Sequence, residues 1–419
     1  MEKNNKTLNV PHLRFPEFSD EWEVHKLSEY LDFKNGLNPE AKRIGHGLPF
    51  ISVMDILVDD VIHYDNIRSK VDATNKEIEC FGVKKGDLLF QRSSETFEDI
   101  GRANVYMDDR TAIYGGFVIC GRKTGNYDPL FFKYLLATPL ARKRTCRMGA
   151  GAQHFNIGQE GLSKISLHFP TVGEQKKIAD LLELIDQRIM TQKKIIEDLK
   201  KLKDAIAEKL FCSPDDETPE LRIANSSVCW NLYRLKDVCQ RISERNSQES
   251  SSLVLTIAAQ YGLVSQTDFF NKSVASENLS NYYLIQKGDF AYNKSYSGEY
   301  PWGAVKRLEL YEKGVLSPLY ICFRPNPLIV NSDFLSHYFE THKWHNGIAQ
   351  IAGEGARNHG LLNVSISDYF ATSHRLPGLS EQKKIASYLN LLSDKISLAN
   401  KELQCYSRQK QYLLARMFI

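Results

Sequence analysis

The sequence lacks the features that mark several large classes of protein. Its eight cysteines are scattered, with no Cys-x-x-Cys pair, which favours a reduced, cytoplasmic protein without a structural metal. No apolar run approaches the length of a membrane span, and the polar start is unlike a signal peptide, so we expect no membrane partner. The 54 basic and 51 acidic residues nearly balance. Any binding to nucleic acid must therefore come from local basic patches.

Catalytic signatures are missing as well. The pattern Gly-x-x-x-x-Gly-Lys-Ser/Thr does not occur, so we expect no ATP motor. Amino-methyltransferases carry Asn/Asp-Pro-Pro-aromatic, whereas residues 128–131 (Asp-Pro-Leu-Phe) and 326–329 (Asn-Pro-Leu-Ile) lack the second proline and are interpreted as turns. The histidines show no metal-ligand spacing, and His342 and His345 are expected on a helix surface. The sequence predicts no catalytic, cofactor-binding or metal-binding residue.

What the sequence does contain is one pattern written twice. Residues 170–189 and 377–396 share the string Glu-Gln-Lys-Lys-Ile-Ala at an offset of 207 residues, which is 377 minus 170. Three shorter matches precede it in each half: Pro-x-Leu-Arg followed by Trp from 11 and 219, Lys-Gly-Asp from 85 and 287, and a hydrophobic residue with Ile-Cys from 118 and 320. The sequence predicts a duplicated frame with divergent inserts and a boundary near residue 213.

A long helix is predicted at the end of each half. Apolar residues recur at alternating spacings of three and four from Ile178 to Leu210 and from Ile385 to Met417, with polar interruptions such as Gln192. Five heptads of this kind favour a coiled coil about 55 Å long. The second insert begins where the first helix ends and is followed at once by the second helix, so we expect an antiparallel pair with an approximate two-fold axis. Packing of each helix on its own domain is the open alternative.

The fold class expected is α+β: two similar mixed α/β domains joined by two long antiparallel helices. The boundaries we expect are a first domain over 1–173, a central spacer helix over 174–212, a second domain over 213–380 and a C-terminal spacer helix over 381–419.

Local patterns inside the inserts predict short strands and one helix in each. Strands are expected at 48–53, 87–90 and 319–323, and one helix at 130–147 and another at 332–351.

These motifs resemble the specificity subunits of type I restriction–modification enzymes. The resemblance rests on the Pro-x-x-x-Glu-Gln-Lys-Lys-Ile-Ala helix start, on glycine turns at 149–151 and 353–355 followed by Asn156-Ile157 and Asn363-Val364, and on the Pro-x-Leu-Arg…Trp start of each half. It covers essentially the whole chain. The second half departs from the first at Ile223-Ala224 and Ser393, where the first has Phe15-Pro16 and Asp186.

The resemblance implies a non-catalytic subunit of a multisubunit methyltransferase and endonuclease. Each insert would be a target recognition domain that reads one part of a bipartite double-stranded DNA target. The helices would set the gap and dock two modification (methyltransferase) subunits, with restriction (endonuclease/translocase) subunits outside. S-adenosylmethionine and ATP would be cofactors of the partner subunits only. Two alternatives are weighed against this: a self-contained methyltransferase or nuclease, which the missing motifs disfavour, and a coiled-coil scaffold without DNA, which the two different polar inserts disfavour.

Side chains that read base edges or bind phosphates are expected in the inserts. In the first domain the candidates are Gln91, Arg92, Ser93, Ser94, Arg102, Asn104, Arg142, Lys143, Arg144, Arg147, Gln153 and His154. In the second domain they are Asn293, Lys294, Ser295, Tyr296, Lys306, Arg307, Arg357, Asn358 and His359. A solvated surface residue is the open alternative for each. The lysine pairs 176–177 and 383–384 face either DNA or the partner subunit, and we favour the partner.

Overall fold

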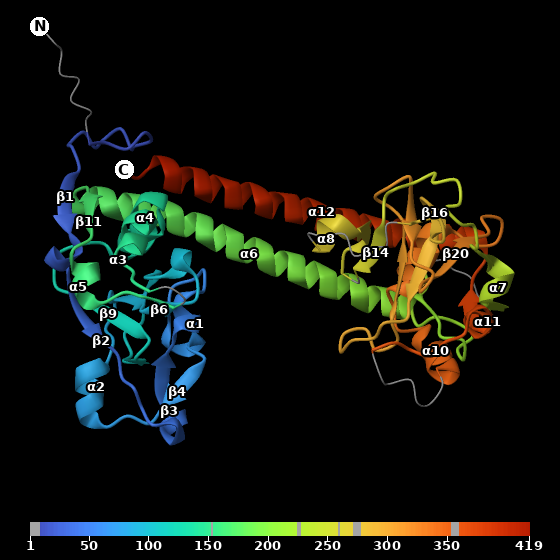
Figure 1. The fold of residues 1–419 in the computed structure, drawn as a ribbon, viewed down its shortest axis with the longest axis horizontal. Coiled ribbons are helices and arrows are strands. Elements are labelled where there is room, and N and C mark those ends of the chain that lie inside the picture. Colours follow the sequence, from blue (N-terminus) through green and yellow to red (C-terminus); the bar gives the residue numbers. More distant parts are fainter. Residues whose placement is uncertain (1–8, 152–153, 224–227, 259, 271–277, 353–359) are drawn as a thin grey trace, which may run out of the picture. The chain divides into compact units, whose positions relative to one another are not determined.

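The structure is a computed structural model that describes residues 9–151, 154–223, 228–258, 260–270, 278–352 and 360–419. The chain divides into two compact units, one of Met1–Lys193 with Lys401–Ile419 and one of Lys194–Asn400 (Figure 1). Each unit holds one mixed domain together with a part of both long helices, α6 (Val172–Leu210) and α12 (Leu379–Arg416).

The first unit is built on a four-stranded antiparallel sheet. Its strand order is β2-β9-β5-β7, with bounds Leu31–Asn35, Val118–Lys123, Leu88–Gln91 and Ala103–Val105. A three-stranded sheet joins β4 (Ser69–Val71), β3 (Ile44–Ile51) and β8 (Ile113–Tyr114). Two short ribbons pair β1 (Glu23–Lys26) with β11 (Ser166–Phe169) and β6 (Ser93–Ser94) with β10 (Phe155–Asn156). Among the described residues, its short α-helices are α1 (Val53–Ile56), α2 (Asn75–Phe81), α3 (Pro129–Ala137), α4 (Pro139–Arg147) and α5 (Gln159–Ser163).

The second unit repeats the same frame. Its four-stranded sheet has the order β13-β20-β17-β18, with bounds Cys239–Arg241, Ile321–Pro325, Phe290–Asn293 and Ala304–Arg307. Three ribbons pair β12 (Asn231–Arg234) with β21 (Ser373–Leu376), β14 (Leu255–Ala258) with β15 (Gly262–Ser265), and β16 (Tyr283–Gln286) with β19 (Lys313–Leu316). Its short helices are α7 (Leu235–Val238), α8 (Gln266–Phe270), α9 (Ser332–Phe339), α10 (His345–Ile351) and α11 (Ile366–Ala371). The duplicated sequence therefore folds as a duplicated sheet, and the α+β prediction is confirmed.

The single helix predicted for each insert is wrong, because two helices occupy each segment. In the first domain Thr138 adopts an extended conformation and its hydroxyl accepts a hydrogen bond from the backbone of Ala141, so it caps a new helix at Pro139. Proline cannot donate the backbone hydrogen bond that a continuous helix needs, and the residue before it is disfavoured in the helical conformation. In the second domain α9 stops at Phe339 and α10 starts at His345.

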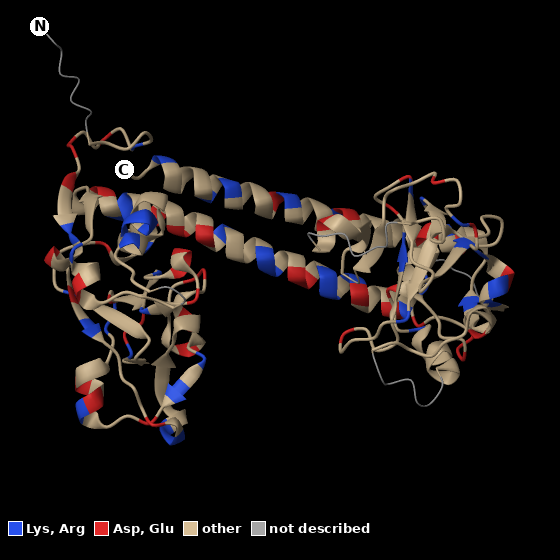
Figure 2. Ribbon diagram, in the orientation of Figure 1, with Lys and Arg blue, Asp and Glu red and all other residues tan. Residues whose placement is uncertain are grey.

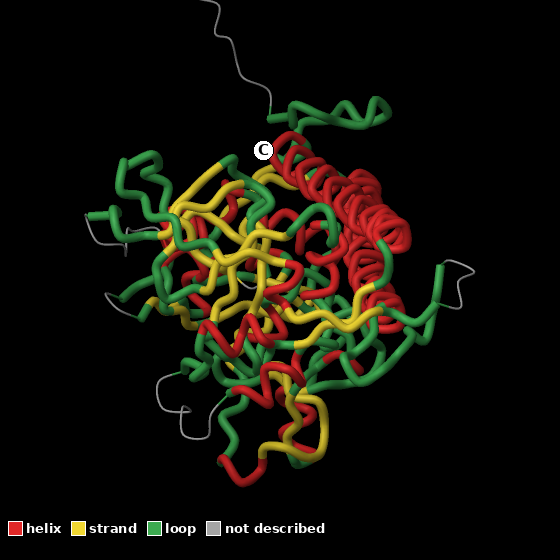
Figure 3. The backbone as a smooth tube through the Cα atoms, turned by 90° about the vertical axis from the view of Figure 1, so that its right-hand side faces the viewer, coloured by secondary structure: helices red, strands yellow, loops and turns green. Residues whose placement is uncertain are grey.

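The long helices run antiparallel, as predicted. Within the first unit, Asp186 of α6 pairs with Lys410 of α12 at 2.5 Å, and Gln192 donates to Glu402 at 3.0 Å. The residue numbers rise along one helix as they fall along the other, and Figures 1 and 3 show the two helices side by side. The a/d seam is buried, from Ile178 at 1 % exposure to Ile196 at 6 %. Its first residues also join the core of their own domain, so the alternative interpretation is partly right.

The duplicated motifs lock each domain onto its long helix. Arg14 of the Pro-x-Leu-Arg start makes two 2.7 Å hydrogen bonds to Glu174, and Arg222 binds Glu381 at 3.1 and 2.8 Å. The amides that follow, Gln175 and Gln382, hold the segment before the helix: each donates to the proline carbonyl five residues earlier and accepts a backbone N–H from the N-terminus of α3 or α9. The motifs that repeat in the sequence are therefore the residues that hold the frame together.

No helix among the described residues is long and apolar enough to cross a membrane.

Candidate nucleic-acid interface

The predicted run from Gln91 to Ser94 lies where the central sheet of the first domain ends. Strand β5 stops at Gln91, and β6 begins two residues later and pairs with β10 in the register Ser93 to Asn156. Between them, the backbone carbonyl of Arg92 accepts a hydrogen bond from Ile157 at 3.0 Å. The fold therefore brings the end of strand β5 together with the segment that follows His154.

A hollow of about 400 Å³ lies beside Arg92. The Arg92 guanidinium donates to the carbonyl of Gly116 at 3.2 Å, and the hollow is lined by Asn35, Arg92, Asn156, Ile157, Gly158, Gln159 and Glu160. Three of these side chains are amides, which together with arginine form the usual base-edge contacts in the DNA major groove. Sequence reasoning missed Asn35 and Gln159 because they come from β2 and α5, far apart in the chain. Asn156 was within reach, since it belongs to a motif that both halves share.

Two of the predicted polar side chains point inward. Asn104 is 1 % exposed and its amide donates to the carbonyl of Asp60 at 2.8 Å, so it holds the loop after α1 against the sheet. Gln91 is 5 % exposed and donates to the carbonyl of Ser93 at 2.9 Å, and its carbonyl oxygen has no hydrogen-bond partner among the described residues. Both side chains therefore hold the backbone at the end of the sheet and are not available on its surface to contact DNA.

The basic run on α4 divides into anchored and exposed residues. Arg142 donates to the carbonyls of Glu98 and Ile100 at 2.9 and 2.6 Å, and burial lowers the pKa of its guanidinium. Arg144 donates to the carbonyl of Ser166. Lys143 and Arg147 are exposed, which leaves them accessible to phosphate. Arg102, which precedes β7, is half exposed and pairs with Asp99 at 2.8 Å.

The second domain repeats the strand-end arrangement with different side chains. Asn293 ends β17 as Gln91 ends β5, and Ser295 forms an isolated bridge with Leu361. The backbone carbonyl of Lys294 accepts from Leu362 at 2.9 Å, just as Arg92 accepts from Ile157. Tyr296, next along, donates its backbone N–H to the carbonyl of Gly360 at 3.1 Å.

Lys306 and Arg307 on β18 are committed to ion pairs. Lys306 lies 2.6 Å from Glu340, and Arg307 lies 2.6 Å from Asp333 and 2.8 Å from Glu309. These pairs neutralise both cations, so they are weak candidates for phosphate contact. Gln153, Arg357, Asn358 and His359 lie outside the described residues. Within each unit basic and acidic residues are interspersed, as Figure 2 shows, which agrees with the balanced composition.

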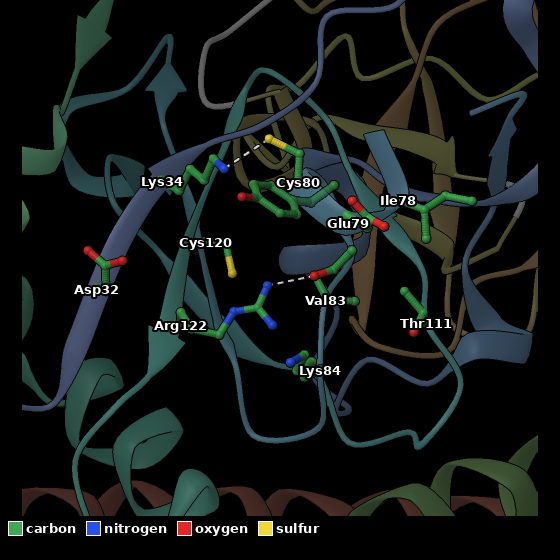
Figure 4. Close-up of a pocket in the computed structure, with 12 residues that line it drawn as sticks. Asp32, Lys34, Ile78, Glu79, Cys80, Val83, Lys84, Thr111, Cys120 and Arg122 are labelled. Carbon is green, nitrogen blue, oxygen red and sulfur yellow. Dashed lines mark hydrogen bonds between the residues drawn. The ribbon is translucent and has the colours of Figure 1, made fainter. Parts of the chain in front are cut away.

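A larger hollow of about 620 Å³ in the first domain does not resemble an active site (Figure 4). Burial raises the pKa of the Cys120 thiol well above its usual range, so it stays protonated. Arg122 donates to the carbonyl of Gly82 at 2.6 Å and pairs with buried Asp87 at 3.2 Å. The second domain has the same ion pair, Asp289 with Arg324 at 2.6 Å, which indicates a structural role. No group of three His, Cys, Asp or Glu side chains in the described part of the chain is placed to hold a metal ion.

Comparison with known proteins gives consistent matches. Residues 19–201 match the family model of the type I restriction modification DNA specificity domain. Two proteins of Methanocaldococcus jannaschii are similar in sequence. The putative type I restriction enzyme MjaX specificity subunit is 26 % identical over 211 residues, covering 49 % of each chain. The type I restriction enzyme MjaVIII specificity subunit is 25 % identical over 244 residues, covering 57 % of this chain and 52 % of its own. The matched stretch thus spans about half the length of these curated relatives.

The fold is similar to that of a solved S subunit of a type I restriction–modification system from M. genitalium. The TM-score is 0.56 with 16 % sequence identity, over 98 % of this chain and 99 % of the other. This likeness extends the agreement in fold to both halves. Residues 19–201 therefore match the DNA specificity domain of type I restriction–modification systems, and over about half of its length the chain is similar in sequence to specificity subunits of such systems.

Proposed function

We propose that this chain is the non-catalytic DNA-recognition subunit of a type I restriction–modification complex, with each half reading one part of a bipartite target. The observation that carries the proposal is that both domains share one sheet topology but have different polar side chains at the corresponding strand ends. The sheets β2-β9-β5-β7 and β13-β20-β17-β18 have the same strand order, yet the residues at the corresponding strand ends differ. The first has Gln-Arg-Ser-Ser at 91–94 and the second Asn-Lys-Ser-Tyr at 293–296. Different side chains at equal positions suit two different half-sites.

The proposed reading surface of the first domain is narrower than the set predicted from sequence. Arg92, Ser93 and Ser94 would contact base edges together with Asn35 and Asn156 around the hollow. The exposed cations Lys143, Arg147 and Arg102, with His154, would contact phosphates, which position a protein on the duplex without reading sequence. Arg142, Arg144, Gln91 and Asn104 would support these residues through their hydrogen bonds to the backbone.

In the second domain Lys294, Ser295 and Tyr296 would form the corresponding surface. The side-chain oxygen of Asn293 holds the turn by accepting a hydrogen bond from the backbone N–H of Ser295 at 3.0 Å. Lys306 and Arg307 would serve the fold through their ion pairs.

We further propose that the long helices space the two readers and dock two modification subunits, with restriction subunits joining outside them. Apolar side chains outside the buried seam support docking, among them Leu184 at 58 % exposure and Leu391 at 64 %. Exposed Lys176, Lys177, Lys383 and Lys384 at the helix starts would lie near those partners. S-adenosylmethionine and ATP would bind only to the partner subunits, and the complex would act in the cytoplasm.

The experiment that tests this function maps methylated sites in cells that express the chain with its modification subunit. The expected result is methylation of one asymmetric, bipartite sequence, and none when either subunit is expressed alone. The purified chain should neither transfer a methyl group nor bind S-adenosylmethionine. Methyl transfer by the isolated chain would establish the self-contained enzyme instead. Assembly with the modification subunit without any DNA binding in a gel shift would establish the scaffold.

A further inference from the structure

An exposed apolar side chain stands at the same place in both domains. Phe117 is 67 % exposed and Leu319 is 68 % exposed. Single apolar residues on a surface are ordinary, but these two share one turn of the duplicated frame. The N–H of Val118 donates to the carbonyl of Gly115 at 2.9 Å, and the N–H of Tyr320 donates to that of Ser317 at 3.1 Å. Each side chain therefore occupies the third position of a four-residue turn, just before the strand β9 or β20.

The residues at the second position of these turns show that the local sequence of each domain favours the turn. Gly116 fills it in the first domain, where an added Cβ would lie 1.7 Å from the Asn38 side-chain oxygen. Pro318 fills it in the second domain, and proline is favoured at this position because its fixed φ suits the turn. Two different residues thus produce the same chain reversal, and the apolar residue that follows is presented outward both times.

The apolar residue lies opposite a cation of the proposed reading surface. The N–H of Arg92 donates to the carbonyl of Phe117 at 2.9 Å, and the β5–β9 register continued by one residue places the two opposite each other. In the second domain the β17–β20 register ends at Tyr292 with Ile321, two residues before Lys294 on one strand and two residues after Leu319 on the other. Directly opposite residues of antiparallel strands have Cβ atoms about 5 Å apart. The first domain therefore presents an apolar group beside a cation, and the second carries the same two kinds of residue just beyond the corresponding strand ends.

The chemistry of the duplex edge identifies what such an apolar group can contact. In the major groove the base pairs present hydrogen-bonding groups and one apolar group, the 5-methyl of thymine. Stacking on a base requires an aromatic ring, which Leu319 does not have. A wedge between base steps is a minor-groove device, whereas the neighbouring Arg92, Asn35 and Asn156 carry the donors and acceptors used in the major groove. A two-stranded ribbon such as β6–β10 also fits that groove.

We infer that Phe117 and Leu319 each contact the 5-methyl group of a thymine, one in each half-site. The inference rests on the proposed function and adds the residue and the base atom through which part of each half-site is read.

The test uses the complex of the full chain with its modification subunit and duplexes that carry the mapped target. Each thymine of both strands is replaced singly by deoxyuridine, which lacks only the 5-methyl group, and binding is measured by fluorescence anisotropy. One replacement in each half-site should weaken binding about four-fold, the effect of one buried methyl-sized group. Phe117→Ser should remove the sensitivity at the position in one half-site only, and Leu319→Ser at the position in the other. Val24→Ser and Leu232→Ser, matched exposed residues at 55 and 52 % on β1 and β12, should leave both sensitivities intact.

Three outcomes would overturn the inference while leaving the DNA-recognition function standing. One is a mapped half-site without any A·T pair. Another is a deoxyuridine sensitivity that persists in Phe117→Ser and Leu319→Ser. The third is weaker binding of these variants by the same factor on thymine and deoxyuridine duplexes, which would indicate a wedge or a phosphate contact. Failure to find any sequence-specific site would overturn the proposed function and the inference together.

Discussion

Replacing Arg14 by methionine should destabilise the first unit by much more than an exposed ion pair does. The Arg14 side chain is 14 % exposed and makes two 2.7 Å hydrogen bonds to the Glu174 carboxylate, which is 1 % exposed. Arg14→Met leaves that carboxylate buried without its cation. Removing one partner of a buried pair costs about 3–5 kcal/mol.

We expect a value near 3 kcal/mol, for two reasons. Water reaches the partly exposed edge of the pair, and Glu174 lies in the first turn of α6, where the helix dipole stabilises a carboxylate by about 0.3–1 kcal/mol. For a unit of roughly 200 residues, 3 kcal/mol corresponds to a fall in melting temperature of about 6–12 °C.

The assay is thermal denaturation of the full chain followed by circular dichroism. The control is Lys164→Met, which removes an i,i+4 pair with Glu160 whose side chains are 61 and 82 % exposed and should change the melting temperature by little. The double variant Arg14→Met/Glu174→Met should recover most of the loss, because an apolar pair needs no compensating charge. An Arg14→Met variant that melts with the control would refute the conclusion that the repeated motif is a structural lock.

Three further predictions concern the readers, the spacer and the pH dependence of stability. Exchanging residues 14–169 for the corresponding domain of a relative should change one half-site only, as methylation mapping would show, whereas a change in both would mean that the domains do not read independently. Inserting one heptad after Lys193 and one after Asn400 preserves the a/d seam and adds about 10.5 Å of helix. The preferred gap between the two half-sites should then lengthen by roughly three base pairs, as measured by selection from DNA libraries with variable gaps. An unchanged gap in an assembled variant would show that the helices are not the spacer. Burial lowers the pKa of His374 to about 4, so between pH 6.5 and 4 the unfolded chain binds a proton that the folded chain does not, and stability should fall as the pH falls through that window. His374→Gln should make the melting temperature depend less on pH in melts at pH 7.5 and 5. An equally steep pH dependence in this variant would contradict the assignment to His374.

The parts of the fold that the sequence predicted are those with a local or repeated signal. The a/d seam from Ile178 to Leu210 follows from spacing alone, and the observed helix differs from the predicted bounds by two residues at each end. The duplicated frame followed from matching strings. The break at Thr138 was also readable, because a threonine followed by proline is a capping signal.

The candidate interface was harder to predict, because it depends on which way a side chain faces. Asn104 and Arg102 stand two residues apart with similar polar character, yet one is buried against the sheet and the other is half exposed. Asn35 and Phe117 reach Arg92 from β2 and from the turn before β9. Sheet register brings these residues together although they lie far apart in the sequence, and amino-acid composition does not encode that register.

The first unit is built from two separate segments of the chain, Met1–Lys193 and Lys401–Ile419, and this imposes an order on its folding. Its core is closed by residues from the far end of the chain: the Phe418 ring lies 6.2 Å from that of Trp22 and 5.4 Å from that of Phe131, and the N–H of Leu13 donates to the carbonyl of Arg416 at 2.9 Å. The second unit is continuous from Lys194 to Asn400, so all of it is synthesised before residues 401–419 of the first unit. A nascent first domain therefore exposes an apolar face around Trp22 until Phe418 packs against it. A first domain acquired by recombination must also present a surface that packs against Phe418. The exchange of recognition domains is therefore constrained by residues 401–419 as well as by the exchanged segment itself.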